Sequence, residues 1–209
     1  MTRFEYASDR SLMVYVDDRR DILKLLARLE AHPIPGIRNL HPASRSMLIV
    51  FDPIAHDHAE IERGVIECLH RLDENELPEP REIEISVRYG GAAGPDLDDV
   101  ARLHGFAPER VIELHCSARY SVSFLGFAPG FAYLDGLPRE LETPRLPSPR
   151  KRVPAGSVGI GGAHTGVYPF DSPGGWRLIG STALAMFDPS RAEPSLLRVG
   201  DAVRFKPIR

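Results

Sequence analysis

VPAGSVGIGGAHTGVYPFDSPGGWRLIG, residues 153–180, mixes many glycines and prolines with strand-forming apolar residues. Val158, Ile160, Tyr168 and Trp176 are among these, whereas disordered segments rich in glycine and proline usually lack such residues. Glycine within a strand pattern marks a bulge, a sharp bend or a place where another group approaches the backbone. The stretch therefore predicts either the corners of a small barrel or backbone amides that line a ligand site.

Short strands separated by turn signals continue on both sides of this stretch. They include EIEISVRYGG (82–91), YSVSFLGF (120–127) and DAVRFKPI (201–208). Two helical patterns follow the first of them, with Asp96 as the expected N-cap and Gly105 after the first helix. Pro108 lies near the first turn of the second helix. Such spacing is typical of an all-β barrel or sandwich, here with two short helices.

The first part of the chain has a different pattern. SLMVYV (11–16) and SMLIVFDP (46–53) predict strands, with a short strand expected at 37–40. Apolar residues at helical spacing predict helices over 17–32 and 58–72. The polar, proline-bearing segment 73–82 is an expected linker. We therefore predict a small α+β sandwich domain over 1–80 and a mainly-β barrel domain over 81–209.

Composition narrows the classes of function. The chain has 209 residues with a net charge of −3, so no basic field favours nucleic acid or an anionic membrane. The N-terminal residues contain no apolar stretch long enough for a signal peptide or a membrane span, and we expect a cytoplasmic protein. Cys68 and Cys116 are too few for a disulfide framework or a cysteine zinc site.

Three short motifs do not carry known chemistry. AGSVG (155–159) lacks the first glycine and the following helix of a nucleophile elbow. GIGGAHTG (159–166) lacks the lysine and the helix of a phosphate-binding loop. HDH (56–58) offers two imidazoles without an apparent third ligand, so no metal site is predicted.

Four residues are candidates for catalysis. His115, Tyr120 and His164 lie near segments rich in glycine and proline, and imidazole exchanges protons near neutral pH. Arg145 lies in the proline-stiffened basic segment 141–154, where a guanidinium can hold a carboxylate or phosphate. The alternatives are a helix-end cation for His115 and a solvated basic loop for Arg145.

The segment FLGFAPGFAYLDGLP (124–138) interleaves aromatic and small residues. Its rings either wall an apolar groove or fill the barrel core. Together with the glycine-rich stretch, it gives a predicted substrate-binding set of Phe127, Pro129, Gly130, Phe131, Gly156, Ser157, Gly162, Thr165 and Tyr168.

Segments 124–138, 143–162 and 165–180 closely resemble the Kip inhibitor family, which is also called allophanate hydrolase subunit 1 and 5-oxoprolinase subunit PxpB. The resemblance is specific over residues 87–182 and looser over the first 80 residues. It implies a cyclophilin-like barrel after the small α+β domain. His164 departs from the family, which commonly has glutamine at this position.

The resemblance also implies function. It implies a subunit of an ATP-dependent 5-oxoprolinase, which opens 5-oxo-L-proline to L-glutamate. The implied partners are a barrel-like second subunit of the allophanate hydrolase subunit 2 (PxpC) type and a LamB/YcsF-type subunit. The alternatives are a non-catalytic module that inhibits a sensor histidine kinase and a carboxyltransferase or allophanate hydrolase subunit of urea metabolism.

Overall fold

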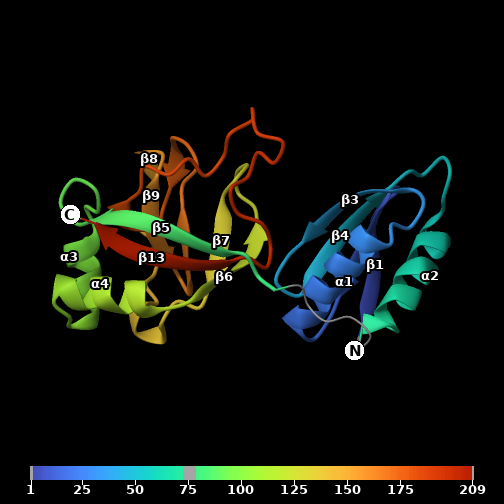
Figure 1. Ribbon diagram of the computed structural model, residues 1–209, viewed down its shortest axis with the longest axis horizontal. Helices are drawn as coiled ribbons and strands as arrows, with labels where there is room; N and C mark the ends of the chain where they lie inside the picture. The colour runs from blue at the N-terminus through green and yellow to red at the C-terminus, as the bar shows by residue number, and fades with distance from the viewer. Residues whose placement is uncertain (1, 73–78, 209) are drawn as a thin grey trace. The chain divides into compact units, whose positions relative to one another are not determined.

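The computed structural model describes residues 2–72 and 79–208. By internal contacts the chain divides into two compact units, Met1–Glu79 and Pro80–Arg209 (Figure 1). Most of the predicted linker, 73–82, lies outside the described residues.

The first unit is a four-stranded antiparallel sheet with two helices on one face. Its elements are β1 (Arg3–Ser8), β2 (Ser11–Tyr15), α1 (Arg19–Ala31), β3 (Ile37–Pro42), β4 (Ser46–Phe51) and α2 (His58–Leu69), and the strand order is β1-β2-β4-β3. Asp18 caps α1, and Asp57 and Glu60 form a capping box at the start of α2. The predicted strands and helices are thus confirmed, whereas β1, a mostly exposed edge strand, was not predicted.

Alternation of side chains explains how this unit forms its core. Leu12 and Val14 of β2 and Met47, Ile49 and Phe51 of β4 point to the same face, because successive strand residues face opposite sides. The buried positions of the two helices pack against that face: Ile22, Leu25, Leu29, Ile61, Val65 and Cys68.

The second unit contains a closed seven-stranded barrel, in the order β10-β7-β6-β13-β5-β12-β9, which confirms the barrel prediction. Its strands are β5 (Glu82–Tyr89), β6 (Tyr120–Leu125), β7 (Ala132–Asp135), β9 (Ser157–Gly161), β10 (His164–Val167), β12 (Arg177–Ser181) and β13 (Ala202–Ile208). Helices α3 (Leu97–His104) and α4 (Pro108–Ser117), the short 3-10 helix η2 (Arg139–Leu141) and a ribbon of β8 (Arg150–Val153) and β11 (Ser172–Gly174) complete the unit. Strand β13 runs parallel to β5, as Figure 1 shows.

The barrel strands separate two apolar clusters. On β10, Val167 joins the barrel core together with Val158, Ile160, Ile179 and Phe205. The next residue, Tyr168, joins a second cluster with Phe131, Val153, Trp176 and Leu178. Because neighbouring strand residues face opposite sides, this second cluster covers the outer surface of the barrel.

The glycines of residues 153–180 make room for a tryptophan on that outer surface. A Cβ atom at Gly161 would lie 2.4 Å from Nε1 of Trp176, and one at Gly159 would lie 3.2 Å from Cβ of Trp176. A Cβ atom added at Gly166 would likewise lie close to the Trp176 and Phe131 rings. Of the explanations that the sequence left open, close approach of side chains to the backbone therefore accounts for these three glycines.

The two helices of the second unit begin and end close to the predicted positions. Gly105 ends α3 in the left-handed conformation, with φ of 68°, and Pro108 opens α4. Asp96 occupies the N-cap position of α3, but its side chain makes no capping hydrogen bond. This corrects the expected role of Asp96, whose carboxylate is used elsewhere in the fold.

Candidate functional site

A buried chain of polar groups runs through the barrel core around His115. The imidazole is fully buried, with Nδ1 2.7 Å from the Tyr89 hydroxyl and Nε2 2.9 Å from the Thr165 hydroxyl. The Thr165 hydroxyl donates to the carbonyl of Gly159 at 2.9 Å, and the Cys116 thiol donates to the Tyr89 oxygen at 3.4 Å. These bonds connect α4 with β5, β9 and β10.

The donors fix the tautomer of His115. The Thr165 hydroxyl has one proton, which it gives to Gly159, so it accepts from an Nε2–H of His115. Nδ1 then lacks a proton and accepts from the Tyr89 hydroxyl. The chain therefore has a single direction from the Cys116 thiol to the Gly159 carbonyl, and each of its donors has an acceptor.

Burial keeps the hydrogen-bonded side chains around His115 uncharged. Loss of solvation lowers the pKa of His115 from 6.5 to about 3, so the imidazole is neutral at physiological pH. Burial also raises the pKa of Tyr89 and that of Tyr120, whose hydroxyl donates to the His115 carbonyl at 2.8 Å. Three predicted site residues, His115, Tyr120 and Thr165, thus meet inside the barrel, away from the outer surface.

Six aromatic side chains meet in and around the apolar cluster on the outer surface, and we call them the outer aromatic cluster: Phe124, Phe127, Phe131, Tyr133, Tyr168 and Trp176. The Phe131 ring lies 5.1–5.3 Å from the rings of four of the others, in edge-to-face contacts. Phe131 and Tyr168 are buried, whereas Phe127 is 59% exposed. Most rings of segment 124–138 are therefore packed against the protein, whereas the Phe127 ring is open to solvent.

His164 lies at one edge of the outer aromatic cluster. Its Nε2 is 3.1 Å from Oδ1 of Asp135, and both side chains are about one-third exposed. The imidazole meets the Tyr133 and Phe124 rings edge-on. A carboxylate that orients a solvent-accessible imidazole is an arrangement suited to proton transfer.

Arginine side chains act on Tyr168 at another edge of the cluster. Burial raises the pKa of Tyr168, while the Trp176 backbone N–H, Arg145 and Arg150 act in the opposite direction. Arg145 is exposed, and no carboxylate pairs with it within residues 2–72 and 79–208. Arg145 is therefore the arginine of this region that is available to an anion.

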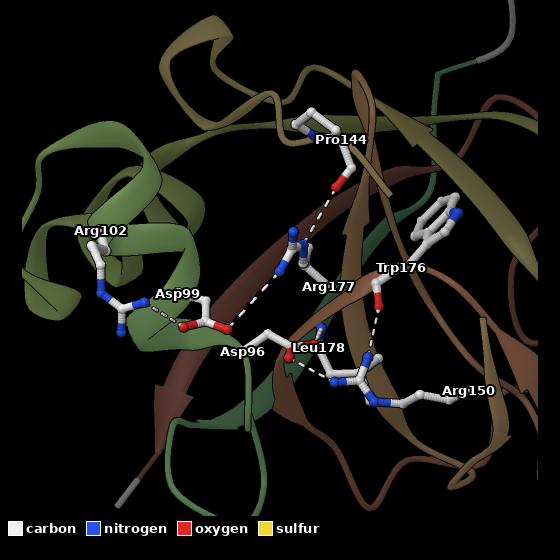
Figure 2. A network of polar contacts seen from close by, with 8 residues as sticks. All are labelled: Asp96, Asp99, Arg102, Pro144, Arg150, Trp176, Arg177 and Leu178. Atoms are coloured by element: carbon white, nitrogen blue, oxygen red, sulfur yellow. Dashed lines mark hydrogen bonds and ion pairs between the residues drawn. The ribbon is translucent and has the colours of Figure 1, made fainter. Parts of the chain in front are cut away.

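Arg150 is already bound within the fold. Its guanidinium donates to Oδ1 of Asp96 at 2.6 Å and to the Trp176 carbonyl at 3.5 Å, and both contacts are drawn in Figure 2. Oδ2 of Asp96 accepts from the Leu178 amide at 2.7 Å, and the Asp96 amide donates to the Leu178 carbonyl at 2.8 Å. Asp96 thereby joins the start of α3 to β8 and β12.

A second part of this network lies nearer the surface, where Asp99 and Arg102 are exposed but the Arg177 side chain is only 16% exposed. Asp99 receives a hydrogen bond from Arg102 at 2.9 Å and lies 3.9 Å from Arg177, which donates to the Pro144 carbonyl at 3.4 Å (Figure 2). The Leu146 amide donates to Gly175 at 2.7 Å. These bonds hold the segment that carries Arg145 against the barrel.

The glycine-rich backbone offers fewer free amides than predicted. The Gly156 amide donates to Tyr168, the Ser157 amide to Pro154 and the Gly162 amide to Thr143, at 2.8, 3.2 and 2.8 Å. These amides are paired within the fold, which corrects the expectation that they face a ligand. Gly130 is buried against Phe187, whereas Pro129 is exposed beside it.

Sequence reasoning missed several residues of this region. Asp96 was expected only as a cap and Tyr89 only as a strand residue, because the local sequence around each does not indicate which distant residue it contacts. Among the described residues, no group of three or more His, Cys, Asp or Glu side chains is placed to hold a metal ion. In the same residues, no helix has the length and apolar character needed to cross a membrane.

Comparison with known proteins gives consistent relatives. The family described as carboxyltransferase domain, subdomain C and D, matches residues 2–197. The B-type 5-oxoprolinase subunit of Escherichia coli O157:H7 is 50% identical over 93% of this chain and 88% of its own length. The B-type 5-oxoprolinase subunit of Bacillus subtilis is 43% identical over 87% of this chain and 80% of its own. The crystal structure of TTHA0988 superposes with a TM-score of 0.83 at 37% identity, over 96% of this chain but only 40% of that longer chain.

Proposed function

We infer, from the premise that this chain belongs to the carboxyltransferase-domain family of subdomains C and D, that it is the B-type subunit of a 5-oxoprolinase complex. The membership agrees with the resemblance to the allophanate hydrolase subunit 1 family. The observation that carries the proposal is the high identity to proteins named as B-type 5-oxoprolinase subunits, over at least four-fifths of their length. Such a subunit acts within a hydrolase complex.

The proposed reaction is the ATP-dependent opening of 5-oxo-L-proline to L-glutamate. Hydrolysis of this stable lactam needs coupling. Transfer of the γ-phosphoryl group of ATP to the amide oxygen, with ADP as the leaving group, activates the carbonyl carbon toward water. The C–N bond of the adduct then breaks to free the amine, and a second water releases phosphate from the resulting acyl phosphate to give glutamate. Anionic groups in such a reaction need hydrogen-bond donors held in place. The exposed Arg145 supports this role, since its segment is held on the barrel and it has no carboxylate partner in the described part of the chain.

Within this proposal, the reacting groups are His164 and Arg145 on the outer surface of the barrel: His164 transfers a proton and Arg145 binds an anion. His164 is oriented by Asp135 and accessible to solvent, so it is suited to carry a proton. His115 and Tyr120 instead support the strand that carries His164, because both are buried in the core and bonded to protein atoms. ATP and the barrel-like and LamB/YcsF-type subunits complete the proposed complex.

Reconstitution tests the function directly. This chain is co-expressed with the barrel-like and LamB/YcsF-type subunits from the same source, and the complex is purified. We expect ATP hydrolysis that depends on 5-oxo-L-proline and yields glutamate. A complex without such hydrolysis would contradict the proposal. Inhibition of histidine kinase autophosphorylation by this chain alone, without partner or ATPase, would instead favour the binding module.

Replacing His164 by glutamine tests its role in the same complex. Glutamine keeps a hydrogen bond to Asp135 but cannot carry a proton. We expect one ionisation to be lost from the pH profile of kcat, while turnover at its optimum falls by less than ~10-fold, because the family that the chain resembles commonly has glutamine at this position. Full turnover with an unchanged pH profile would limit His164 to hydrogen bonding.

A further inference from the structure

The side chain of Tyr168 carries a buried hydroxyl with a proton to donate. Tyr168 is 2% exposed, and its ring packs edge-on against Phe131 within the outer aromatic cluster. The Trp176 backbone N–H acts as a donor toward the hydroxyl oxygen. In the part of the chain that the structure describes, no atom accepts a hydrogen bond from the hydroxyl itself. Because buried tyrosine hydroxyls normally find a partner, this proton is available to a ligand.

Close packing against a glycine fixes the position of this hydroxyl. A Cβ atom at Gly174 would lie 2.4 Å from the Tyr168 hydroxyl oxygen, so the hydroxyl lies against the backbone of β11. Gly174 pairs with Arg150 of β8, and the next residue, Gly175, accepts from the Leu146 amide at 2.7 Å. The hydroxyl therefore lies beside the proline-stiffened basic segment.

This segment brings a positive charge close to the hydroxyl. Arg145 directly precedes Leu146 and is exposed. Burial raises the pKa of Tyr168, whereas Arg145 acts in the opposite direction, as a nearby cation does. Pro144 accepts a hydrogen bond from Arg177 at 3.4 Å, so the backbone is held on both sides of Arg145. The guanidinium thus extends from a fixed point of the backbone near Tyr168.

Two carboxylates on neighbouring elements are already occupied by other partners. Asp96 pairs with Arg150 at 2.6 Å. Asp171 pairs with Arg152 at 2.6 Å and accepts a hydrogen bond from the Ala155 amide at 2.9 Å. Within residues 2–72 and 79–208, the Arg145 guanidinium therefore has no carboxylate partner and keeps its charge for a ligand.

We propose that the Tyr168 hydroxyl and the Arg145 guanidinium together bind the carboxylate of 5-oxo-L-proline, and we call this pair the carboxylate site. The inference rests on the proposed function, in which 5-oxo-L-proline is the substrate. A planar carboxylate accepts two hydrogen bonds from a guanidinium fork and has lone pairs left for a hydroxyl proton. Its charge also matches that of the guanidinium.

The alternative anion is a phosphate group of ATP, for which the fold provides less. Nucleotide phosphates are typically bound by several backbone amides of a glycine-rich loop that opens a helix and carries a lysine. Here the amides of Gly156, Ser157 and Gly162 are paired within the fold, and strand β10, not a helix, follows β9. These features favour a carboxylate over a phosphate.

Two ligands that differ in one group test the carboxylate site in the reconstituted complex. 5-Oxo-L-proline carries the carboxylate and 2-pyrrolidone lacks it, and both dissociation constants are measured by ligand-observed NMR titration without ATP. Tyr168→Phe removes the hydroxyl, and Arg145→Gln removes the charge. We expect each variant to bind 5-oxo-L-proline at least ~10-fold more weakly than the wild type, and 2-pyrrolidone within about twofold, because only the former loses a charge-assisted hydrogen bond. Arg145→Lys keeps the charge without the fork and should lose less affinity than Arg145→Gln.

Arg110→Gln is the matched control, because it removes an exposed arginine of α4 that pairs with Glu113. It should bind both ligands as the wild type does. The melting temperature of the isolated Tyr168→Phe chain should fall by no more than about 4 °C, since only the Trp176 amide loses an acceptor. Equal losses for the two ligands, or wild-type affinity of Tyr168→Phe for 5-oxo-L-proline, would overturn the carboxylate site. Weaker binding of ATP with unchanged binding of 5-oxo-L-proline would assign the donors to a phosphate and overturn it too.

The outcomes distinguish this inference from the proposed function. Hydrolysis that depends on 5-oxo-L-proline in the wild type, with unchanged affinity in both variants, would overturn the carboxylate site and leave the proposed function in place. Binding of 5-oxo-L-proline that both variants lose, in a wild-type complex without ATP hydrolysis, would support the site and contradict the proposed function. A wild-type complex that does not bind 5-oxo-L-proline would overturn both.

Discussion

Replacing His115 by alanine is expected to lower the free energy of unfolding by roughly 3–5 kcal/mol, the range for losing a large buried side chain together with its hydrogen bonds. The imidazole packs 4.5 Å from the Phe205 ring and holds the Tyr89 and Thr165 hydroxyls. Without it, the buried Tyr89 hydroxyl loses its acceptor and the core gains a cavity. Urea titration of both proteins measures the difference. Thr165→Val, which removes one hydroxyl at nearly constant volume, should cost only about 1–2 kcal/mol.

The same residue makes stability depend on pH. The folded pKa of His115, about 3, lies below the unfolded value of 6.5, so the unfolded chain binds the extra proton between these values. Its contribution is complete above pH 6.5 and decreases as pH falls toward about 3. The expected slope from this residue is about 1.4 kcal/mol per pH unit below its unfolded pKa.

The non-titrating variant His115→Asn should lack this slope, since carboxylates titrate equally in both proteins. Equal slopes for the two proteins below about pH 6 would contradict a neutral buried His115. If the variant does not fold, nitrogen NMR of the wild-type imidazole gives a second measurement. A proton on Nε2 alone at about pH 5 agrees with the chain of hydrogen bonds, and a doubly protonated ring does not.

Local patterns were sufficient to predict most of the fold. Apolar strand-forming runs gave β2 and β4, and a period-two run gave β5. Apolar residues at helical spacing gave α1 and α2, and cap and proline signals gave α3 and α4. Strand β1 was not predicted, because an exposed edge strand buries too few side chains to need alternating apolar and polar residues. The ribbon of β8 and β11 was not predicted, because the prolines, glycine and charged residues in and around it are typical of a loop. Tertiary pairing, not local sequence, makes these segments strands.

The site was harder to predict than the fold. Proximity to glycine-rich segments grouped His115 with His164, but Thr165 and His164 are consecutive on β10 and belong to opposite sides of the barrel wall. The glycines were expected to supply free amide donors, whereas three of them instead leave the space that the Trp176 side chain occupies. Register and closure of the barrel decide both outcomes. A single sequence does not contain them in a form that spacing rules can read.

Removing the Asp96 carboxylate is the second change with a large expected effect. Asp96→Ala leaves the Arg150 guanidinium, only 28% exposed, without its anion and the buried Leu178 amide without its acceptor. Breaking a buried ion pair from one side usually costs 3–5 kcal/mol, so we expect a loss of about 3 kcal/mol, since Arg150 is partly solvated. Asp96→Asn keeps an acceptor for the amide and should lose about half as much. Chemical denaturation of the isolated chain measures both.

Asp99→Ala provides the control on the same helix. Asp99 pairs with Arg102 at the surface, where such pairs contribute about 0–1 kcal/mol, so this variant should be nearly as stable as the wild type. Because Asp96 joins α3 to β8 and β12, the double variant Asp96→Asn, Arg150→Met should recover part of the loss by removing the unpaired charge. If the double variant is as unstable as the sum of the single variants, Asp96 and Arg150 do not act as a pair. The Leu178 amide would then account for the role of Asp96.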